Sequence, residues 1–345
     1  MAYTTQASGI VPGGSANPTV SFSQIASAMG APATNIKLGD YYRNGSYVKG
    51  DGNNQYVPTS GNVLPVSRLR GACRRVICTV TSAQNRIDLS GVYSHSNEVW
   101  NGSSWVTGPF NEWGRSTDKT VQLNANVYSN NTTEAFRVPT GAGSQVVLNM
   151  NGSSIYGYGG NPGGSNAGQG GQGYTAIYTQ SNLAINGGGG SIVGGGGGGG
   201  GGGRGGQEGN DGRNNRNYCC GWFCPQCSSC DRGVGGGNDG GGSGGQGGRG
   251  AWYTTGAQGG QGGQNPGNGG GGGGSGGPGG GLGSNGSNGQ GGGPGSPGPG
   301  GNCQGGGGGQ GGQGGGSGGG SGHWVVGNQY ISTTNVNTSG RSANS

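Results

Sequence analysis

The chain has 345 residues, of which 100 are glycine, 27% are hydrophobic and 8% are charged. This composition lies far outside that of an ordinary globular domain and excludes one conventional core along the whole length. The 17 basic and 11 acidic residues give a net charge of +6, which is too dilute for a nucleic-acid-binding surface. The sequence holds no run of about 18 apolar residues, so membrane insertion is not expected.

The N-terminal part, residues 1–72, contains short units in which alternating apolar residues are followed by Ser or Gly. The units span residues 20–25, 36–41 and 64–69. The alternation predicts a short strand, after which Ser23 or Ser67 would act as the N-cap of a brief helical turn. Gly30 stands where the first turn would end. We expect a docking region of strand-turn repeats.

A dense basic run begins within the last of these units. It consists of Arg68, Arg70, Arg74 and Arg75. A solvated or subunit-contacting turn is favoured over a phosphate site. The first residues of the chain lack the basic and apolar stretches of a secretory signal, so synthesis in a cytoplasm is expected.

Residues 73–150 are rich in β-branched and aromatic residues that alternate with polar ones, as in strands. Turn signals such as Asn101-Gly102 separate the runs. We expect a β-rich domain, either a small antiparallel sandwich or a sheet packed against neighbours, with little α-helix. Trp100, Trp105, Phe110 and Trp113 lie close together in this part. They are interpreted as the core of a hairpin, with a carbohydrate-stacking platform as the alternative.

Residues 151–322 are mostly glycine, which usually indicates a flexible linker. Non-glycine residues nevertheless recur at a spacing of three, as in Ser243, Gln246 and Arg249. A polyproline-II helix has three residues per turn, so this spacing predicts helices with two bare glycine edges that pack into a polyglycine-II bundle. The strict Gly-X-Y repeat of collagen is missing. The overall prediction is a mainly β and irregular protein, with a β-rich N-terminal region followed by this bundle.

Two similar sequences lead into the glycine tracts, each with a short apolar strand, an Asn-containing turn and an Ile. The isoleucines are Ile155 and Ile192, and we expect them to plug the end of the bundle. After the bundle, residues 323–345 contain an organised apolar stretch, predicted to be a C-terminal strand and tail.

A cysteine cluster interrupts the glycine-rich half. Its members are Cys219, Cys220, Cys224, Cys227 and Cys230, with Cys303 as a sixth candidate partner. Four thiolates at this spacing could bind zinc, whereas disulfides would staple a loop without a core of its own. Disulfides are slightly favoured, and no other cofactor is expected. Either arrangement would display Trp222 and Phe223.

The sequence resembles tailed-bacteriophage virion proteins in two places. The units at residues 36–45 and 64–71 are similar to N-terminal repeats of phage structural proteins. Residues 145–337 resemble phage tail-fibre adhesins, with Asn-Gly-Ile sequences before glycine tracts and a Val-Val-Gly-Asn motif after them. The resemblance implies a virion tail location, other tail proteins as partners and a homotrimer as one option.

In those adhesins, loops between the glycine helices recognise a host outer-membrane protein or surface glycan. Carried over by resemblance, this role would fall on residues 218–231 and 251–255. The receptor-binding candidates are Tyr218, Trp222, Phe223, Trp252 and Tyr253.

Catalysis is not expected, because the two histidines and scattered acids form no paired-carboxylate or metal-binding motif. The first functional hypothesis is a host-binding adhesin, and the second is a purely structural tail or baseplate component. An ice-binding protein is a third and disfavoured hypothesis, because it gives no role to the N-terminal half or the cysteine loop.

Overall fold

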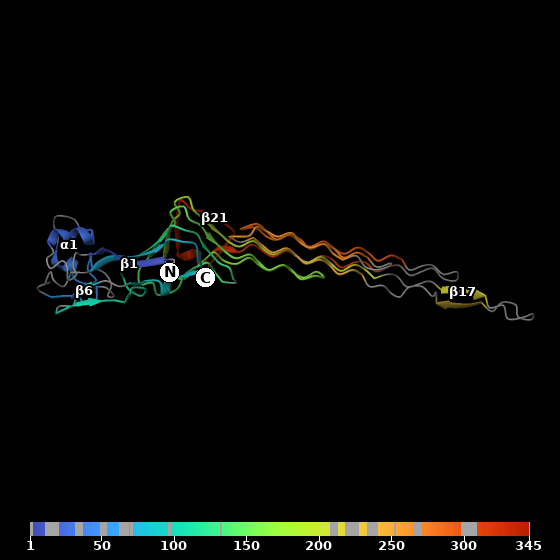
Figure 1. The fold of residues 1–345 in the computed structure, drawn as a ribbon, viewed down its shortest axis with the longest axis horizontal. Coiled ribbons are helices and arrows are strands. Elements are labelled where there is room, and N and C mark those ends of the chain that lie inside the picture. The colour runs from blue at the N-terminus through green and yellow to red at the C-terminus, as the bar shows by residue number, and fades with distance from the viewer. Residues whose placement is uncertain are drawn as a thin grey trace, which may run out of the picture.

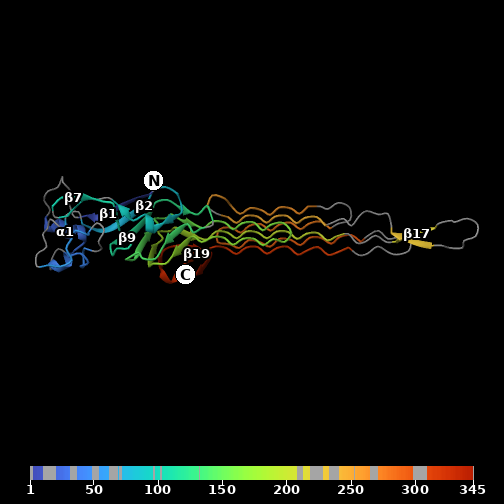
Figure 2. The same ribbon diagram turned by 90° about the horizontal axis from the view of Figure 1, so that it is seen from below.

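A computed structural model describes residues 3–10, 21–31, 37–48, 54–61, 69, 72–95, 98–101, 103–131, 133–207, 213–217, 228–232, 241–251, 253–264, 271–297 and 309–344. The molecule is elongated (Figures 1 and 2). The N-terminal region with helix α1 lies at one end, β-sheets follow, and glycine-rich segments extend side by side to the other end, where β17 lies.

The N-terminal region contains the one α-helix of the described residues, α1 (Phe22–Met29). Ser21 caps it in a reciprocal capping box with Gln24, and Gly30 ends it in the left-handed conformation at φ 63°. The expected stop at Gly30 is confirmed, whereas the N-cap is Ser21 and not Ser23. A 3-10 helix, η1 (Leu38–Tyr41), follows. The helices share a small core made of Ile25, Met29, Tyr41, Tyr42, Val48, Val57, Leu69 and Ala72.

The β-rich part consists of three sheets whose strands are mostly parallel. The first is β1 (Tyr3–Ile10), β2 (Cys73–Val80), β9 (Asp118–Leu123), β12 (Val146–Asn149), β15 (Leu183–Asn186) and β20 (Ile331–Thr334). The second is β21 (Asn337–Ser339), β16 (Ser191–Val193), β13 (Ile155–Tyr156), β10 (Val127–Tyr128) and β3 (Gln84–Asn85). The third is β22 (Arg341–Ala343), β19 (His323–Val326), β14 (Ile177–Thr179), β11 (Phe136–Val138) and β4 (Ile87–Asp88). We call them the first, second and third sheet.

The chain visits the three sheets in turn, so it winds as a three-sided β-solenoid. Strands β2, β3 and β4 make one coil, and β9, β10 and β11 make the next. Each strand pairs in parallel with its counterpart one coil away. The expected antiparallel sandwich is therefore wrong. The chain returns to a given sheet only after passing the other two, so successive strands in that sheet run the same way.

Inward-facing residues stack from coil to coil into apolar ladders. The ladder in the first sheet is Cys78, Val121, Leu148, Ile185 and Thr333, and that in the third is Ile87, Phe136, Ile177, Val325 and Ser342. The apolar members are buried, whereas Thr333 and Ser342 are exposed. The last coil thus ends the ladders in hydroxyl groups, as a polar terminal repeat does in other solenoids.

The strands on both sides of the glycine-rich stretch share these sheets. Composition placed a boundary near residue 150 and a separate tail from residue 323. In the structure β19 pairs with β14, and β20 pairs with β15, so the strands from His323 onward belong to the solenoid.

An insertion between β4 and β9 carries the 3-10 turn η3 (Leu89–Gly91) and two small antiparallel strand pairs. Its strands are β5 (Ser94–His95), β6 (Glu98–Trp100), β7 (Trp105–Thr107) and β8 (Phe110–Asn111). The pairs are the β6–β7 hairpin and the β5–β8 pair, whose strands lie on either side of the hairpin in the chain. Trp100 pairs with Trp105 across one hairpin. Phe110 and Trp113 are buried, as expected for a core, and the Trp113 indole donates to the carbonyl of Thr140 at 3.0 Å.

Lys119 is a buried cation inside the solenoid, in register between Val76 and Val146. Its amine donates to the carbonyls of Arg115 and Thr117, at 2.6 and 3.0 Å, and to the hydroxyl of Ser144 at 3.2 Å. Burial lowers the pKa of this amine to about 8, although the nearby carboxylates of Glu112 and Asp118 oppose the shift.

The ladder arrangement predicts opposite outcomes for two neighbours on β12. Leu148 is fully buried, whereas Val147 faces outward. Leu148→Ala should lower the free energy of unfolding by about 2–5 kcal/mol, because it leaves a cavity. Val147→Ala, the matched control, should cost less than about 1 kcal/mol. Urea denaturation followed by circular dichroism measures both, and equal losses would contradict the assignment of faces.

Lys119 predicts a pH-dependent contribution to stability. Its pKa is about 8 in the folded protein and 10.5 ordinarily, so the unfolded chain binds more protons between these values. The stability of the wild type relative to Lys119→Met should therefore rise as the pH rises from about 8 to about 10.5. Denaturation midpoints at pH 7.5, 9 and 10.5 test this, and a constant difference would exclude a depressed pKa.

Candidate functional site

Eight glycine-rich segments lie side by side and form what we call the glycine rod. They span residues 157–164, 168–174, 194–207, 241–251, 256–264, 271–281, 284–297 and 309–322. Six of them form a closed ring in which each is joined to the next by backbone hydrogen bonds. In ring order these are 157–164, 168–174, 309–322, 284–297, 271–281 and 241–251.

The seventh segment, residues 194–207, runs through the centre of this ring. Its amides at Gly196, Gly199 and Gly202 donate to residues 241–251, whereas those at Gly197, Gly200 and Gly203 donate to residues 284–297. Every third residue of the central segment therefore forms a hydrogen bond with the same neighbouring segment. The central segment donates to three neighbours and accepts from the other three, so backbone groups buried along its axis have partners. The eighth segment, 256–264, packs outside the ring between 241–251 and 271–281.

Close backbone contact leaves no room for side chains at the centre. All residues from Gly194 to Gly203 are buried, and a Cβ atom on any of them would collide with a neighbouring backbone. On the outermost segment, a Cβ on Gly259 or Gly262 would meet nothing within 4 Å. The spaced glutamines, including Gln246 and Gln261, are exposed. The side chains therefore follow the accessible edges of the rod.

The rod leaves the solenoid at one corner, between the second and third sheets. Residues 157–174 connect β13 to β14, and residues 194–322 connect β16 to β19. The sheet pairing continues into the rod, because the amide of Gly157 donates to the carbonyl of Val193 and that of Ala176 to His323, both at 2.9 Å.

Ile155 and Ile192 lie in register with each other just before the rod begins. Both are fully buried in the solenoid core. Whether they act as plugs of the bundle stays a prediction, but their position is at its base.

Tyr253 also lies at the base of the rod. Its ring stacks against those of Tyr128 and Tyr156, with centroids 4.9 and 5.2 Å away, on the outer face of the second sheet. The amide of Asn126 donates to its hydroxyl at 3.4 Å. Beside this stack, the guanidinium of Arg249 lies over the ring of Tyr158. Tyr253 thus holds the turn between two rod segments against the solenoid.

The opposite end of the rod carries an antiparallel hairpin, β17 (Arg213–Asn217) and β18 (Ser228–Arg232) (Figure 1). The backbone of Cys230 pairs with Asn215 in it. The remaining receptor-binding and thiol candidates lie outside the described residues. These are Tyr218, Trp222, Phe223, Trp252, Cys219, Cys220, Cys224, Cys227 and Cys303. Of the five receptor-binding candidates, Tyr253 is the one that lies within the described residues.

The metal and thiol chemistry of the described part is limited. Within these residues, no group of three or more His, Cys, Asp or Glu could hold a metal ion. Cys78 is a free, buried thiol, and burial raises its pKa to about 11. No helix in the described part of the chain is long and apolar enough to span a membrane.

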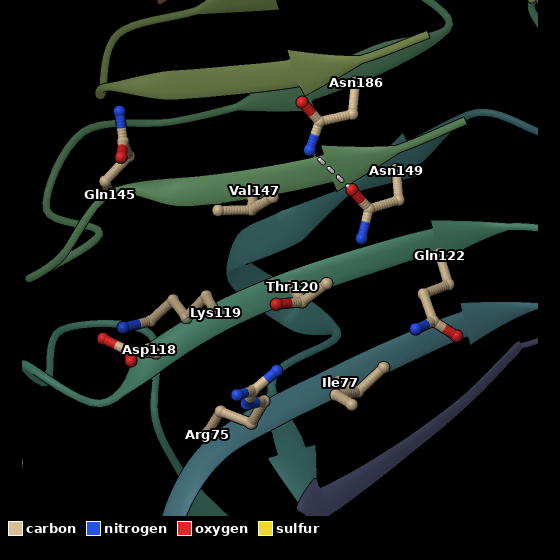
Figure 3. Close-up of a pocket in the computed structure, with 10 residues that line it drawn as sticks. All are labelled: Arg75, Ile77, Asp118, Lys119, Thr120, Gln122, Gln145, Val147, Asn149 and Asn186. Atoms are coloured by element: carbon tan, nitrogen blue, oxygen red, sulfur yellow. Dashed lines mark hydrogen bonds between the residues drawn. The ribbon is translucent and has the colours of Figure 1, made fainter. Parts of the chain in front are cut away.

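A hollow of about 450 Å³ lies on the outer face of the first sheet (Figure 3). We call it the sheet trough. Its floor is a row of short side chains in register, namely Ile77, Thr120 and Val147. Polar side chains flank the floor on both sides, with Arg75, Asp118 and Gln145 along one bank and Gln122, Asn149 and Asn186 along the other. The side-chain amide nitrogen of Asn186 donates to the side-chain amide oxygen of Asn149 at 2.8 Å.

A second hollow of about 390 Å³ adjoins the trough at the next corner of the solenoid. Gln145 lines both hollows, and Tyr330, Gln180 and Asn182 line the second. Sequence reasoning singled out Arg75 only as part of a basic run and missed the others. Alternation identifies outward positions, but only the parallel register shows which of them become neighbours.

Comparison with protein-family models, with curated proteins and with solved structures finds no match to this chain.

Two glycines test the packing of the rod. A methyl group at Gly199 would collide with the carbonyl of Gly277, whereas Gly262 faces open space. Gly199→Ala should destabilise the rod by at least about 1–3 kcal/mol, as overpacking does. Gly262→Ala, the matched control, should be neutral or slightly stabilising. Hydrogen exchange of the rod amides, read by mass spectrometry, measures the difference. Equal exchange in the two variants would refute a glycine-only centre.

Proposed function

We propose that the chain is a bacteriophage tail or tail-fibre protein that acts as an adhesin for the host cell surface. The observation that carries the proposal is the β17–β18 hairpin at the end of the glycine rod farthest from the solenoid (Figure 1). A long element with a loop at its free end keeps that loop clear of the body of the protein. The resemblance of residues 145–337 to phage adhesins supports the same role.

We further propose that the rod is a polyglycine-II bundle. Hydrogen bonds to a given neighbour recur at every third residue, as the threefold repeat of such helices requires. At about 3.1 Å per residue, the central segment would extend roughly 43 Å. A bundle of this length is stiff enough to hold the hairpin away from the virion.

Attachment to other tail proteins would involve the N-terminal region, which lies at the end opposite the rod. The proposed receptor is an outer-membrane protein or a surface glycan, and a homotrimer is one arrangement on the tail. The proposal includes no catalytic step. Zinc or disulfides would staple residues 219–230, with disulfides favoured. The second candidate is a purely structural tail or baseplate component, favoured by the ring of six segments, which would stiffen the rod whatever it displays.

Replacing residues 218–227 with a Gly/Ser sequence of equal length tests the adhesin hypothesis. The labelled full chain should sediment with at least one strain in a panel of Gram-negative cells. The replacement should lower the bound fraction at least tenfold, because it removes the aromatic residues Trp222 and Phe223.

The matched control is Gln258→Ala with Gln261→Ala, two exposed amides on the side of the rod. It should bind as the wild type does. Binding of the loop replacement at the wild-type level, or no binding of the full chain to any strain, would reject the adhesin role and leave the structural candidate.

A further inference from the structure

We infer that the sheet trough binds a short oligosaccharide, at a site separate from the far end of the rod. The inference starts from the shape of the trough. Strands β2, β9, β12 and β15 contribute to it, and neighbouring strands lie about 4.8 Å apart, so the trough crosses roughly 14 Å of sheet. A volume of about 450 Å³ is in the range of small-ligand sites.

The floor of the trough suits one face of a sugar ring. Ile77 and Val147 present apolar surface on either side of the small Thr120. The carbon-bound hydrogens of a pyranose ring can cover these side chains while its hydroxyl groups point to the banks. A bulkier residue in the middle row would fill the trough.

The polar side chains on the two banks can form hydrogen bonds with the hydroxyl groups of a sugar. Side-chain amides offer donors and an acceptor within one planar group, and Gln122, Asn149 and Gln145 place three of them around the floor. The hydrogen bond from the amide nitrogen of Asn186 to the amide oxygen of Asn149 fixes both side chains. The amide nitrogen of Asn149 therefore points away from Asn186 (Figure 3).

The charges of the trough disfavour a polyanion. Arg75 and Asp118 lie directly opposite each other in the β2–β9 register, so a positive and a negative group compensate locally. The amine of Lys119 donates to protein oxygens at the start of the strand. A guanidinium next to a carboxylate can instead bind neighbouring hydroxyls of a neutral or weakly charged sugar.

The second hollow, at the next corner of the solenoid, extends the site. Tyr330 lines it and is half-buried, and Gln145 joins it to the trough. A tyrosine ring offers an apolar face and a polar tip, which is a combination that sugar rings contact well. A chain of sugars in the trough would continue over Tyr330.

The test uses the full-length protein on a printed array of defined oligosaccharides from bacterial lipopolysaccharides, capsules and glucans. At least one oligosaccharide should be retained, and its affinity is then measured by titration calorimetry. Gln122→Ala with Asn149→Ala should weaken binding at least tenfold. Tyr330→Ala should weaken binding of the longer members of the same series but not of the shortest.

Gln246→Ala with Gln261→Ala is the matched control, because it removes two exposed amides from the rod instead of the trough. It should leave the affinity unchanged, as should the replacement of residues 218–227. Circular dichroism and the denaturation midpoint establish that each variant is folded. Array binding lost with residues 218–227 but kept in the trough variants would overturn the inference. No retained oligosaccharide, or retention of arrayed peptides only, would do so as well.

Discussion

Backbone-to-backbone packing around residues 194–207 is the interaction on which the rod depends. Ordering glycine is costly, because it loses more conformational freedom than any other residue. The cost is offset only if each backbone group gains a partner, and the ring of six segments provides partners on every side. Every central residue from Gly194 to Gly203 must then lack a Cβ atom.

The end of this glycine run follows from the same constraint. Gly201 faces residues 164 and 168, at the turn of the short hairpin formed by residues 157–174. Three residues farther along the same edge, that hairpin has ended, and Arg204 is exposed. The first side chain in the central segment therefore appears where the surrounding ring first opens.

The solenoid provides the template from which the rod grows. Residues 157–164 and 194–199 leave β13 and β16 already paired, and their hydrogen bonding continues outward at every third residue. On the returning side, the amide of Gly173 donates to Gly320 and leads into the β14–β19 pairing. Because the glycine segments begin already in register with their partners, closing the loops between them costs less conformational entropy.

Sequence reasoning predicted much of the local structure and little of its arrangement in space. Alternation identified the strands, and Gly30 marked the end of the helix. The parallel solenoid was missed because the residues that stack, such as Leu148 and Ile185, are separated by a whole coil and share no local signal. Tyr253 was grouped with the displayed aromatics because residues 251–255 interrupt the glycine tracts with aromatic side chains. Only the fold shows that its turn returns to the base, where Tyr128 and Tyr156 meet it.

The place of the rod in the chain separates its far end from the core of the solenoid (Figure 1). Entry from β16 and exit into β19 occupy neighbouring sides of one coil, so the inserted residues do not disturb the ladders on either side. The inward residues Ile192 and Val325 keep their registers with Ile155 and Ile177. A change at the β17–β18 hairpin therefore lies a full rod length from the core that stabilises the solenoid. Such an arrangement lets the far-end sequence vary while the glycine segments and the coils keep the composition that their packing demands.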